Sequence, residues 1–391
     1  MIIKNSPIKI DSHNIFENDA LDREKTIKSL TTLVMDITDP FVLSINGDWG
    51  IGKTTFVKLW RIYLQQQNIN SIHFNAWKND FSKEPILSIL GEFNEYIDEN
   101  FSDEDESSIK TKFNKVKEVS AEIIKRAVPA MVKGATAGVL DIDKGFESAI
   151  GAMTEESSKK LIENYSKEKE ITEKFKEAIK KVLDELDSDR PFLVFIDELD
   201  RCRPLYAIEL LENIKHMFGI EKLIFVLSLD KKQLSESIKS QYGNIDTDNY
   251  LRRFIDLEYE LSNPNIDSFC DALYKKFDLK ENIPNSTIKD LVKVFKLSLR
   301  QIEQIFSRLG VIFEHTFEEK YIDLILFFEV LKSYSPNLYD EYLKERDSQN
   351  LLDLVRKDMQ LNMTVFKLFN LLENTDNKSI SKIVNKINME N

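Results

Sequence analysis

Residues 41–55 read FVLSINGDWGIGKTT, and this stretch decides the fold. A short apolar run, 41–46, leads into Gly47–Thr54, which matches the pattern G-x-x-x-x-G-K-[ST]. The residues that follow, TFVKLWRIYL, have helical spacing. Strand, loop and helix in this order are the context in which the pattern wraps phosphate groups. The stretch therefore predicts a nucleotide-binding loop at the end of a buried strand.

Each residue type in the loop has a chemical role. Glycines let backbone N–H groups turn inward around the β-phosphate, and the helix N-terminus adds a positive dipole end. We expect Lys53 to bridge the β- and γ-phosphates as a catalytic cation, Thr54 to place its hydroxyl on Mg²⁺, and Thr55 to touch the α-phosphate. The predicted nucleotide-binding residues of the loop are Gly47, Asp48, Trp49, Gly50, Ile51, Gly52, Lys53, Thr54 and Thr55.

Three further apolar runs are nearly continuous rather than alternating: SIHFNA (71–76), PFLVFID (191–197) and KLIFVLSL (222–229). Such runs are typical of strands buried on both faces of a parallel sheet, and the helical stretches between them indicate crossover connections. FIDLEYEL (254–261) is a fifth candidate strand. The pattern predicts an α/β fold.

The third strand ends in the acidic tip IDELD. An apolar strand that runs into Asp-Glu is typical of the second half of a P-loop ATPase site, so we expect Asp197 to bind Mg²⁺ and Glu198 to act as the general base. The alternative is that Glu198 is a solvated loop residue. Asp200 and Arg201 either form a surface ion pair or reach a neighbouring subunit, and Cys202 is interpreted as a small packing residue.

A catalytic Glu directly after the Mg²⁺-binding Asp belongs to the branch of P-loop proteins with an extra strand between the loop strand and the acidic strand. KLIFVLSL is that extra strand, so the predicted sheet order is 5-1-4-3-2. At its end, Ser228 or Asp230 is placed to sense the γ-phosphate. Asp230 alternatively caps the helix that follows, and we favour this second interpretation.

More than 100 residues separate the second strand from the third, far beyond an ordinary crossover. Within this gap, 155–186 predicts one long helix, because apolar residues recur every three to four positions beside a Lys/Glu face. We interpret residues from about 84 to 190 as a helical insertion in a P-loop NTPase domain that spans 1–261. Residues 262–391 have helical spacing, and they predict a helical lid and a C-terminal helical domain.

The amino-acid composition argues against several classes of protein. With 54 basic and 67 acidic residues, the net charge of −13 disfavours a protein that coats nucleic acid non-specifically. Two cysteines and four histidines support neither a disulfide framework nor a dedicated zinc site, which favours a cytoplasmic protein. No uncharged apolar run reaches 18 residues, so we expect no membrane span.

Four motifs in order resemble the KAP family of P-loop NTPases. They are GDWGIGKTT (47–55), FNAWKND (74–80), FIDELDRCRP (195–204) and YLRRFIDLEYEL (250–261), and the resemblance covers roughly residues 15–310. It implies an additional-strand NTPase that hydrolyses ATP with Mg²⁺ and assembles into a homo-oligomer. Members of the family often insert membrane helices where this chain has charged residues, so it resembles a soluble member. Bacterial members are often associated with phage exclusion or defence.

The same resemblance implies roles for several arginines. Arg252 and Arg253 precede the last strand, where related ATPases direct a catalytic arginine at a neighbour's nucleotide. The alternative, that both are solvated or pair with nearby carboxylates, stays open. Arg300 resembles a lid arginine that contacts the γ-phosphate in cis, and Arg308 is a weaker candidate for that role.

Five other residues have weaker signals. Leu21, Arg23 and Glu24 occupy the place where related ATPases contact the adenine base or the sheet edge. Trp77 is expected to pack under the phosphate loop rather than to stack on a ligand. His73 alternates into its strand and is interpreted as a core histidine.

The leading hypothesis is a Mg²⁺-dependent ATPase whose turnover is coupled to conformational change or oligomerisation. One alternative is a nucleotide-dependent switch or scaffold with slow hydrolysis that recruits an effector protein. A second alternative is a DNA-acting ATPase, against which the acidic balance and the lack of a basic stretch count.

Overall fold

The computed structural model describes residues 14–17, 19–82, 84–101, 109–137, 155–187, 189–262, 264–280, 283–313, 321–345, 351, 353 and 363–388. The chain divides into two compact units. The sheet unit comprises 27–47 and 53–261, and the helical unit comprises 48–52 and 262–391 together with the residues before 27. The tip of the phosphate loop thus clusters with the helical unit. The predicted domain boundaries, 1–261 and 262–391, stay a prediction.

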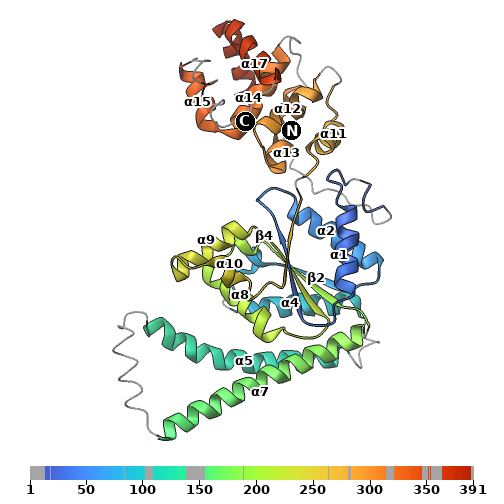
Figure 1. Ribbon diagram of the computed structural model, residues 1–391, viewed down its shortest axis with the longest axis vertical. Helices are drawn as coiled ribbons and strands as arrows, with labels where there is room; N and C mark the ends of the chain where they lie inside the picture. Colours follow the sequence, from blue (N-terminus) through green and yellow to red (C-terminus); the bar gives the residue numbers. More distant parts are fainter. Residues whose placement is uncertain are drawn as a thin grey trace. The chain divides into compact units, whose positions relative to one another are not determined.

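A five-stranded parallel sheet forms the centre of the sheet unit, in the order β2-β3-β4-β1-β5 (Figure 1). Its strands are β1 (Phe41–Asn46), β2 (Ser71–Asn75), β3 (Phe192–Asp197), β4 (Leu223–Leu229) and β5 (Leu257–Glu260). Every pairing between neighbours is parallel. The predicted order 5-1-4-3-2 is confirmed, and all five strands lie within the predicted stretches.

One face of the sheet is covered by α1 (Glu24–Met35) and α2 (Lys53–Gln66). Trp60 of α2 joins these layers, because its ring packs edge-on against Phe195 of β3 at 5.2 Å and its Nε1 donates to the Thr31 hydroxyl of α1 at 2.9 Å. The Trp60 side chain is completely buried. A buried indole whose N–H has a partner is stable, and it fixes the helix that begins at Lys53 against the sheet.

The opposite face packs against α4 (Pro85–Asn100), α8 (Pro204–Met217) and α9 (Lys231–Tyr242). Alternate residues of β3 and β4, such as Val194 and Phe225, belong to the same apolar cluster as these helices. Both central strands are therefore buried on both faces, which explains why their sequences are continuously apolar.

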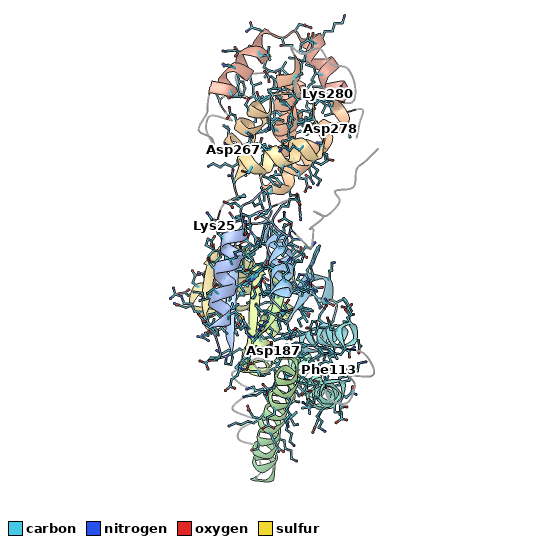
Figure 2. All side chains as sticks on the ribbon, turned by 90° about the vertical axis from the view of Figure 1, so that its right-hand side faces the viewer. Lys25, Phe113, Asp187, Asp267, Asp278 and Lys280 are labelled. Carbon is cyan, nitrogen blue, oxygen red and sulfur yellow. The ribbon has the colours of Figure 1, made fainter. Side chains whose placement is uncertain are left out.

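The predicted insertion contains two long helices, α5 (Ile109–Ala137) and α7 (Glu155–Leu186), which lie side by side (Figure 1). The predicted helix 155–186 is confirmed as α7. Phe113 of α5 and Phe175 of α7 are buried in the cluster that underlies the sheet, and Figure 2 marks Asp187 just beyond the end of α7. None of the described helices is long and apolar enough to cross a membrane.

The helical unit packs around α14 (Ile322–Tyr334), whose residues Leu324–Leu331 are all buried. A helix that is apolar on every side lies inside a bundle. Its neighbours are α12 (Asn285–Val294), α13 (Leu299–Ile312), α15 (Pro336–Glu345), α17 (Met363–Asn374) and α18 (Asn377–Asn388). The helix α11 (Ile266–Lys276) packs against α12 and α13. On the surface, Lys293 of α12 pairs at 2.6 Å with Asp267 of α11, which is labelled in Figure 2.

Candidate nucleotide-hydrolysis site

The carboxyl ends of three neighbouring strands bring a row of polar side chains to one edge of the sheet. The parallel register sets Asn75 of β2 beside Asp197 of β3, and Asp197 beside Ser228 of β4. In open parallel sheets, ligands bind outside this edge. The fold therefore places the acidic tip where a nucleotide site is expected.

The phosphate loop leaves β1 at Gly47, whose N–H donates to the carbonyl of Leu229 at 3.2 Å. Lys53 begins α2, and its Nζ donates to the carbonyl of Gly47 at 2.5 Å, so the side chain folds back over the loop. Burial lowers the pKa of Lys53, while nearby Asp200, Asp230 and Asp197 raise it and Arg201 lowers it. The acidic tip and the loop lysine thus lie within electrostatic range of each other.

Two loop glycines adopt backbone angles that few other residues tolerate, with φ of +83° at Gly50 and +94° at Gly52. Within the helical unit, a Cβ on Gly50 would lie 2.9 Å from the Cβ of Ser298. A Cβ on Gly52 would lie 3.1 Å from the Cδ1 of Leu21 and 3.4 Å from that of Leu299. The start of α13 therefore packs directly on the backbone of the loop.

The other predicted loop residues are more open. Trp49 is half exposed, Asp48 and Thr54 are exposed, and Ile51 and Thr55 are half-buried. Thr54 occupies the first turn of α2, next to Lys53.

Asp197 is almost fully buried, and its two carboxylate oxygens have different surroundings. Its Oδ1 accepts from the Ser228 hydroxyl at 2.8 Å and from the Glu198 N–H at 3.0 Å. Its Oδ2 has no hydrogen-bond partner among the described residues, although the His73 Nε2 lies 3.9 Å away. Burial raises the pKa of Asp197, but His73, Ser228 and Thr54 outweigh it and hold the pKa below its usual value.

An orphaned buried carboxylate oxygen close to a threonine hydroxyl fits a divalent cation. Hard cations such as Mg²⁺ prefer oxygen ligands, and in nucleotide sites they take one or two from protein and the rest from phosphate and water. Asp197 and Thr54 supply such oxygens. Among the described residues, no group of three or more His, Cys, Asp or Glu side chains could hold a metal ion by itself.

Glu198 follows Asp197 and has a left-handed backbone conformation, φ +62° and ψ +29°. Its side chain is only 17% exposed. The Asn75 Nδ2 donates to Oε2 at 2.7 Å, and the Arg201 Nη1 lies 2.7 Å from Oε1. Glu198 is therefore held by two partners and is not a solvated loop residue.

The structure corrects the expectation for Trp77 and shows the surroundings of Ser228 and Asp230 near the tip. Trp77, on α3 (Ala76–Asn79), is 51% exposed and its ring lies under the Arg201 guanidinium at 5.6 Å, so it does not pack under the phosphate loop. Ser228 is fully buried and donates to Asp197, so it orients that carboxylate. A role of Ser228 in sensing the γ-phosphate stays a prediction. Asp230 caps α9 by accepting from the N–H groups of Lys232 and Gln233, as favoured above.

The arginines separate into different environments. Arg252 and Arg253 follow α10 (Thr247–Leu251), are exposed, and carry no ion pair with any described residue. Their role at a neighbour's nucleotide stays a prediction. Arg300 is an exposed residue in the first turn of α13. Arg308 is not a lid arginine, because its Nε pairs at 2.6 Å with Glu329, a fully buried residue of α14.

Arg23 is the least expected of the site's neighbours, because only 2% of it is exposed. Its guanidinium donates to the carbonyl of Ser262 at 2.8 Å, to the hydroxyl of the same residue at 3.1 Å, and to the Ile51 carbonyl at 3.4 Å. Arg23 therefore ties the phosphate loop to Ser262, in the segment that follows β5. Leu21 packs beside it against the helical core, and Glu24 begins α1.

Sequence reasoning missed the roles of Asn75 and Arg23. It offered Asp200 as an ion-pair partner of Arg201, whereas the structure pairs Arg201 with Glu198. One signal for Asn75 was present, because it is the first polar residue at the end of a buried strand, in the same position as Asp197. No signal of that kind marks Arg23, whose partners are more than 25 residues away in the chain.

Comparison with known proteins shows one family match and a few distantly similar proteins. Over 175 residues the chain is 23% identical to the Phage T7 exclusion protein of Escherichia coli (strain K12), covering 40% of this chain and 23% of that relative. The structure of the Aeropyrum pernix ORC2 protein (ADPNP–ADP complexes) has a TM-score of 0.37 at 11% identity and covers 94% of each chain. Drosophila ORC bound to DNA has a TM-score of 0.30 at 12% identity, with 89% of this chain and 70% of that chain covered. Neither structural likeness is strong enough to bear on function.

The family match is far more extensive. Residues 23–388 match the family described as KAP family P-loop domain, so the match includes the phosphate loop, the acidic strand tip and the helical region. It also includes every strand of the sheet in the observed order. On this match, the chain belongs to the KAP family of P-loop domains.

Proposed function

We propose that this chain is a Mg²⁺-dependent ATP hydrolase. The observation that carries the proposal is Asp197, a buried carboxylate with one oxygen fixed by Ser228 and the other without a hydrogen-bond partner, at the strand edge beside Thr54. Burying a carboxylate without a partner is unfavourable unless a cation serves it. The phosphate loop supplies the anion that would accompany such a cation.

The residues divide the chemistry between them. The N–H groups of the loop and the Lys53 ammonium bind the phosphates and oppose their negative charge. Thr54 and Asp197 supply oxygens for the metal, and Mg²⁺ bound there would neutralise charge that develops on the phosphate oxygens. Glu198 accepts a proton from the attacking water and orients it, a contribution of about 10²- to 10⁴-fold in rate for a general base.

The packing of the phosphate loop supports a coupling between nucleotide binding and the arrangement of the helical unit. The start of α13 packs on Gly50 and Gly52, so a change in the backbone of the loop would press on Ser298 and Leu299. Closely packed interfaces respond to small shifts by changing arrangement rather than by stretching. We propose that turnover alters the packing of the helical unit, and that Arg300, one residue further along, contacts the nucleotide in cis.

Assembly and biological role belong to the same proposal. Arg252 and Arg253 are exposed and have no ion pair with a described residue, so they suit a contact with the nucleotide of a second copy, which makes the chain a homo-oligomer when ATP is bound. The phage exclusion protein with which the chain shares 23% identity supports a role in defence, through an effector protein partner.

Phosphate release from ATP tests the proposal, with Lys53→Ala as the variant and Lys58→Ala as its control. Lys58 is an exposed lysine on the same helix, outside the predicted loop. We expect Lys58→Ala to match the unaltered protein, and both Lys53→Ala and removal of Mg²⁺ by a chelator to abolish turnover. Equal turnover in Lys53→Ala and Lys58→Ala would refute the proposal.

A second function is favoured by the contacts of Glu198. Because Asn75 and Arg201 hold both of its oxygens, hydrolysis is slow in this conformation, as in a nucleotide-dependent switch. A switch would assemble on ATP without measurable turnover. Light scattering on a sizing column, with ATP or ADP, distinguishes the two functions: a larger mass with ATP and negligible phosphate release indicates a switch.

A further inference from the structure

We propose that Asn75 and Arg201 are positioning residues that restrain the Glu198 carboxylate and so limit turnover, with Trp77 supporting Arg201. The inference rests on the proposed hydrolysis and concerns its regulation. It starts from a simple geometric fact: each oxygen of the carboxylate that should face water instead has a protein partner at 2.7 Å.

The first restraint is the hydrogen bond from Asn75, and the orientation of its side-chain amide is fixed. The Asn75 Oδ1 accepts from the Lys78 N–H at 2.9 Å and so caps α3, which leaves Nδ2 as the group that faces Glu198. Because the cap fixes the amide, Asn75 can only donate to the carboxylate. The restraint is therefore built into the turn that begins α3.

The second restraint is an ion pair that water screens poorly. The side chain of Arg201 is 26% exposed and that of Glu198 is 17% exposed, so both groups lie mostly within the protein. A partly buried, hydrogen-bonded ion pair persists more than an exposed one.

Trp77 gives Arg201 a second contact. Its ring lies 5.6 Å from the guanidinium carbon, within the range of a cation–π interaction, while half of the ring remains open to solvent. The guanidinium is thereby held between an aromatic face and a carboxylate. The backbone of Glu198 is restrained as well. It has a left-handed conformation, which a residue other than glycine keeps only where its surroundings maintain it.

The restraint is partial, because nucleotide phosphates compete for the same guanidinium. Arg201 lies close enough to Lys53 to contribute to lowering the pKa of that lysine, after burial as the main cause. Phosphate groups bound at Lys53 therefore attract Arg201 away from Glu198. Complexes in which Arg201 stays on Glu198 do not turn over, so the balance between the two positions sets part of kcat.

Steady-state hydrolysis by Arg201→Gln tests the proposal, with Arg203→Gln as the matched control. Arg203 belongs to the same loop but pairs with Asp80, and no described contact joins it to Glu198. We expect Arg201→Gln to raise kcat on the order of tenfold, which is about 1.4 kcal/mol, with KM changed less than twofold. Arg203→Gln should leave both constants unchanged.

Asn75 requires a variant that separates its two roles. Asn75→Ser keeps an oxygen that can cap α3 but removes the amide donor to Glu198, whereas Asn75→Ala removes both. We expect Asn75→Ser to raise kcat severalfold at an unchanged midpoint of thermal unfolding. Trp77→Leu should raise kcat about two- to fivefold and Trp77→Phe should restore the original value, since an aromatic face retains the cation.

The outcomes separate this inference from the proposed function. If Lys53→Ala abolishes hydrolysis but Arg201→Gln leaves kcat unchanged or lowers it, the restraint is wrong and the ATPase stands; a fall would mean that Arg201 stabilises the transition state. If neither the unaltered protein nor Arg201→Gln hydrolyses ATP, the proposed function fails, and the restraint fails with it.

Discussion

Two glycines of the phosphate loop are required by both backbone angle and space. Gly50 and Gly52 have φ above +80°, where a side chain adds strain of roughly 1 kcal/mol, and any Cβ there also meets Ser298, Leu21 or Leu299. We therefore expect Gly50→Ala to weaken ATP binding at least tenfold, as measured by isothermal titration calorimetry.

Gly243 provides the matched control for that prediction. Its φ of +75° is similar, but no atom lies within 4 Å of the position where a Cβ would be. Gly243→Ala therefore adds backbone strain at a positive φ outside the loop, and its dissociation constant for ATP should equal that of the unaltered protein. Equal affinities in Gly50→Ala and Gly243→Ala would mean that the loop tolerates the side chain.

Both cysteines should be unreactive in the folded chain. Burial is the main cause that raises the pKa of Cys202 far above its usual value, and that of Cys270 to about 12. A raised thiol pKa lowers the thiolate fraction, so at pH 8 roughly one Cys270 in ten thousand is ionised, against about a quarter of unperturbed thiols. We expect no alkylation by iodoacetamide at pH 8, as followed by mass spectrometry, and alkylation of both in denaturant. Rapid labelling of the folded protein would contradict the burial.

At the residue scale, the sequence pattern predicts which residues form the site better than it predicts the contacts between them. The loop residues and the Asp197–Glu198 pair follow from a motif in which adjacent positions act together. The partners of Glu198 do not, because Asn75 is 123 residues away in sequence and meets Glu198 only through the register of β2 and β3. Ser228 likewise reaches Asp197 only once β4 is in register.

At the scale of elements, Asp230 shows how a single side chain starts a helix. Its carboxylate accepts from the N–H groups of Lys232 and Gln233 at 3.1 and 3.3 Å, which satisfies two of the unpaired donors of α9. Asp230→Ala should lower the free energy of unfolding by about 1 kcal/mol, while Asp230→Ser keeps a capping oxygen and most of the stability. Urea unfolding followed by circular dichroism measures both, and identical curves for the two variants would contradict the cap.

Arg23 joins three segments that are far apart in the sequence. In Arg23→Met the carbonyls of Ser262 and Ile51 lose a buried donor, which we expect to lower the free energy of unfolding by about 1–3 kcal/mol. Lys25→Met, at an exposed position two residues on and labelled in Figure 2, is the control and should change stability little. A loss no larger than that of the control would show that Arg23 is not structural.

Elements with strong periodicity were predictable, and elements set by tertiary contacts were not. The helix 155–186 follows from its apolar stripe, and β1, β3 and β4 follow from their apolar runs. In β2, by contrast, apolar and polar residues alternate, and so does their burial. The fifth strand is shorter than its apolar stretch, because Phe254 lies in the turn after α10 and packs into the core instead of pairing with β1. The short helix α3 depends on the Asn75 cap, which no periodicity reveals.

At the scale of the whole molecule, the sheet order was predictable and the composition of the units was not. The Asp-Glu tip implied the extra strand and therefore the order of all five strands. Residues 48–52 cluster with the helical unit, because they pack against Leu21, Ser298 and Leu299, and such packing leaves no pattern in the sequence. The helical region beyond 315 contains no recognisable motif, so its bundle around α14 was visible only in three dimensions.

The central claim is that Glu198 is the base of an ATP hydrolysis site. Its most direct test measures ATP affinity and phosphate release on the same preparations of the unaltered protein and Glu198→Gln. Glutamine retains the shape of the side chain but cannot accept a proton, so we expect the dissociation constant to stay within about threefold while turnover falls at least about 100-fold. Turnover in Glu198→Gln equal to that of the unaltered protein would contradict the account.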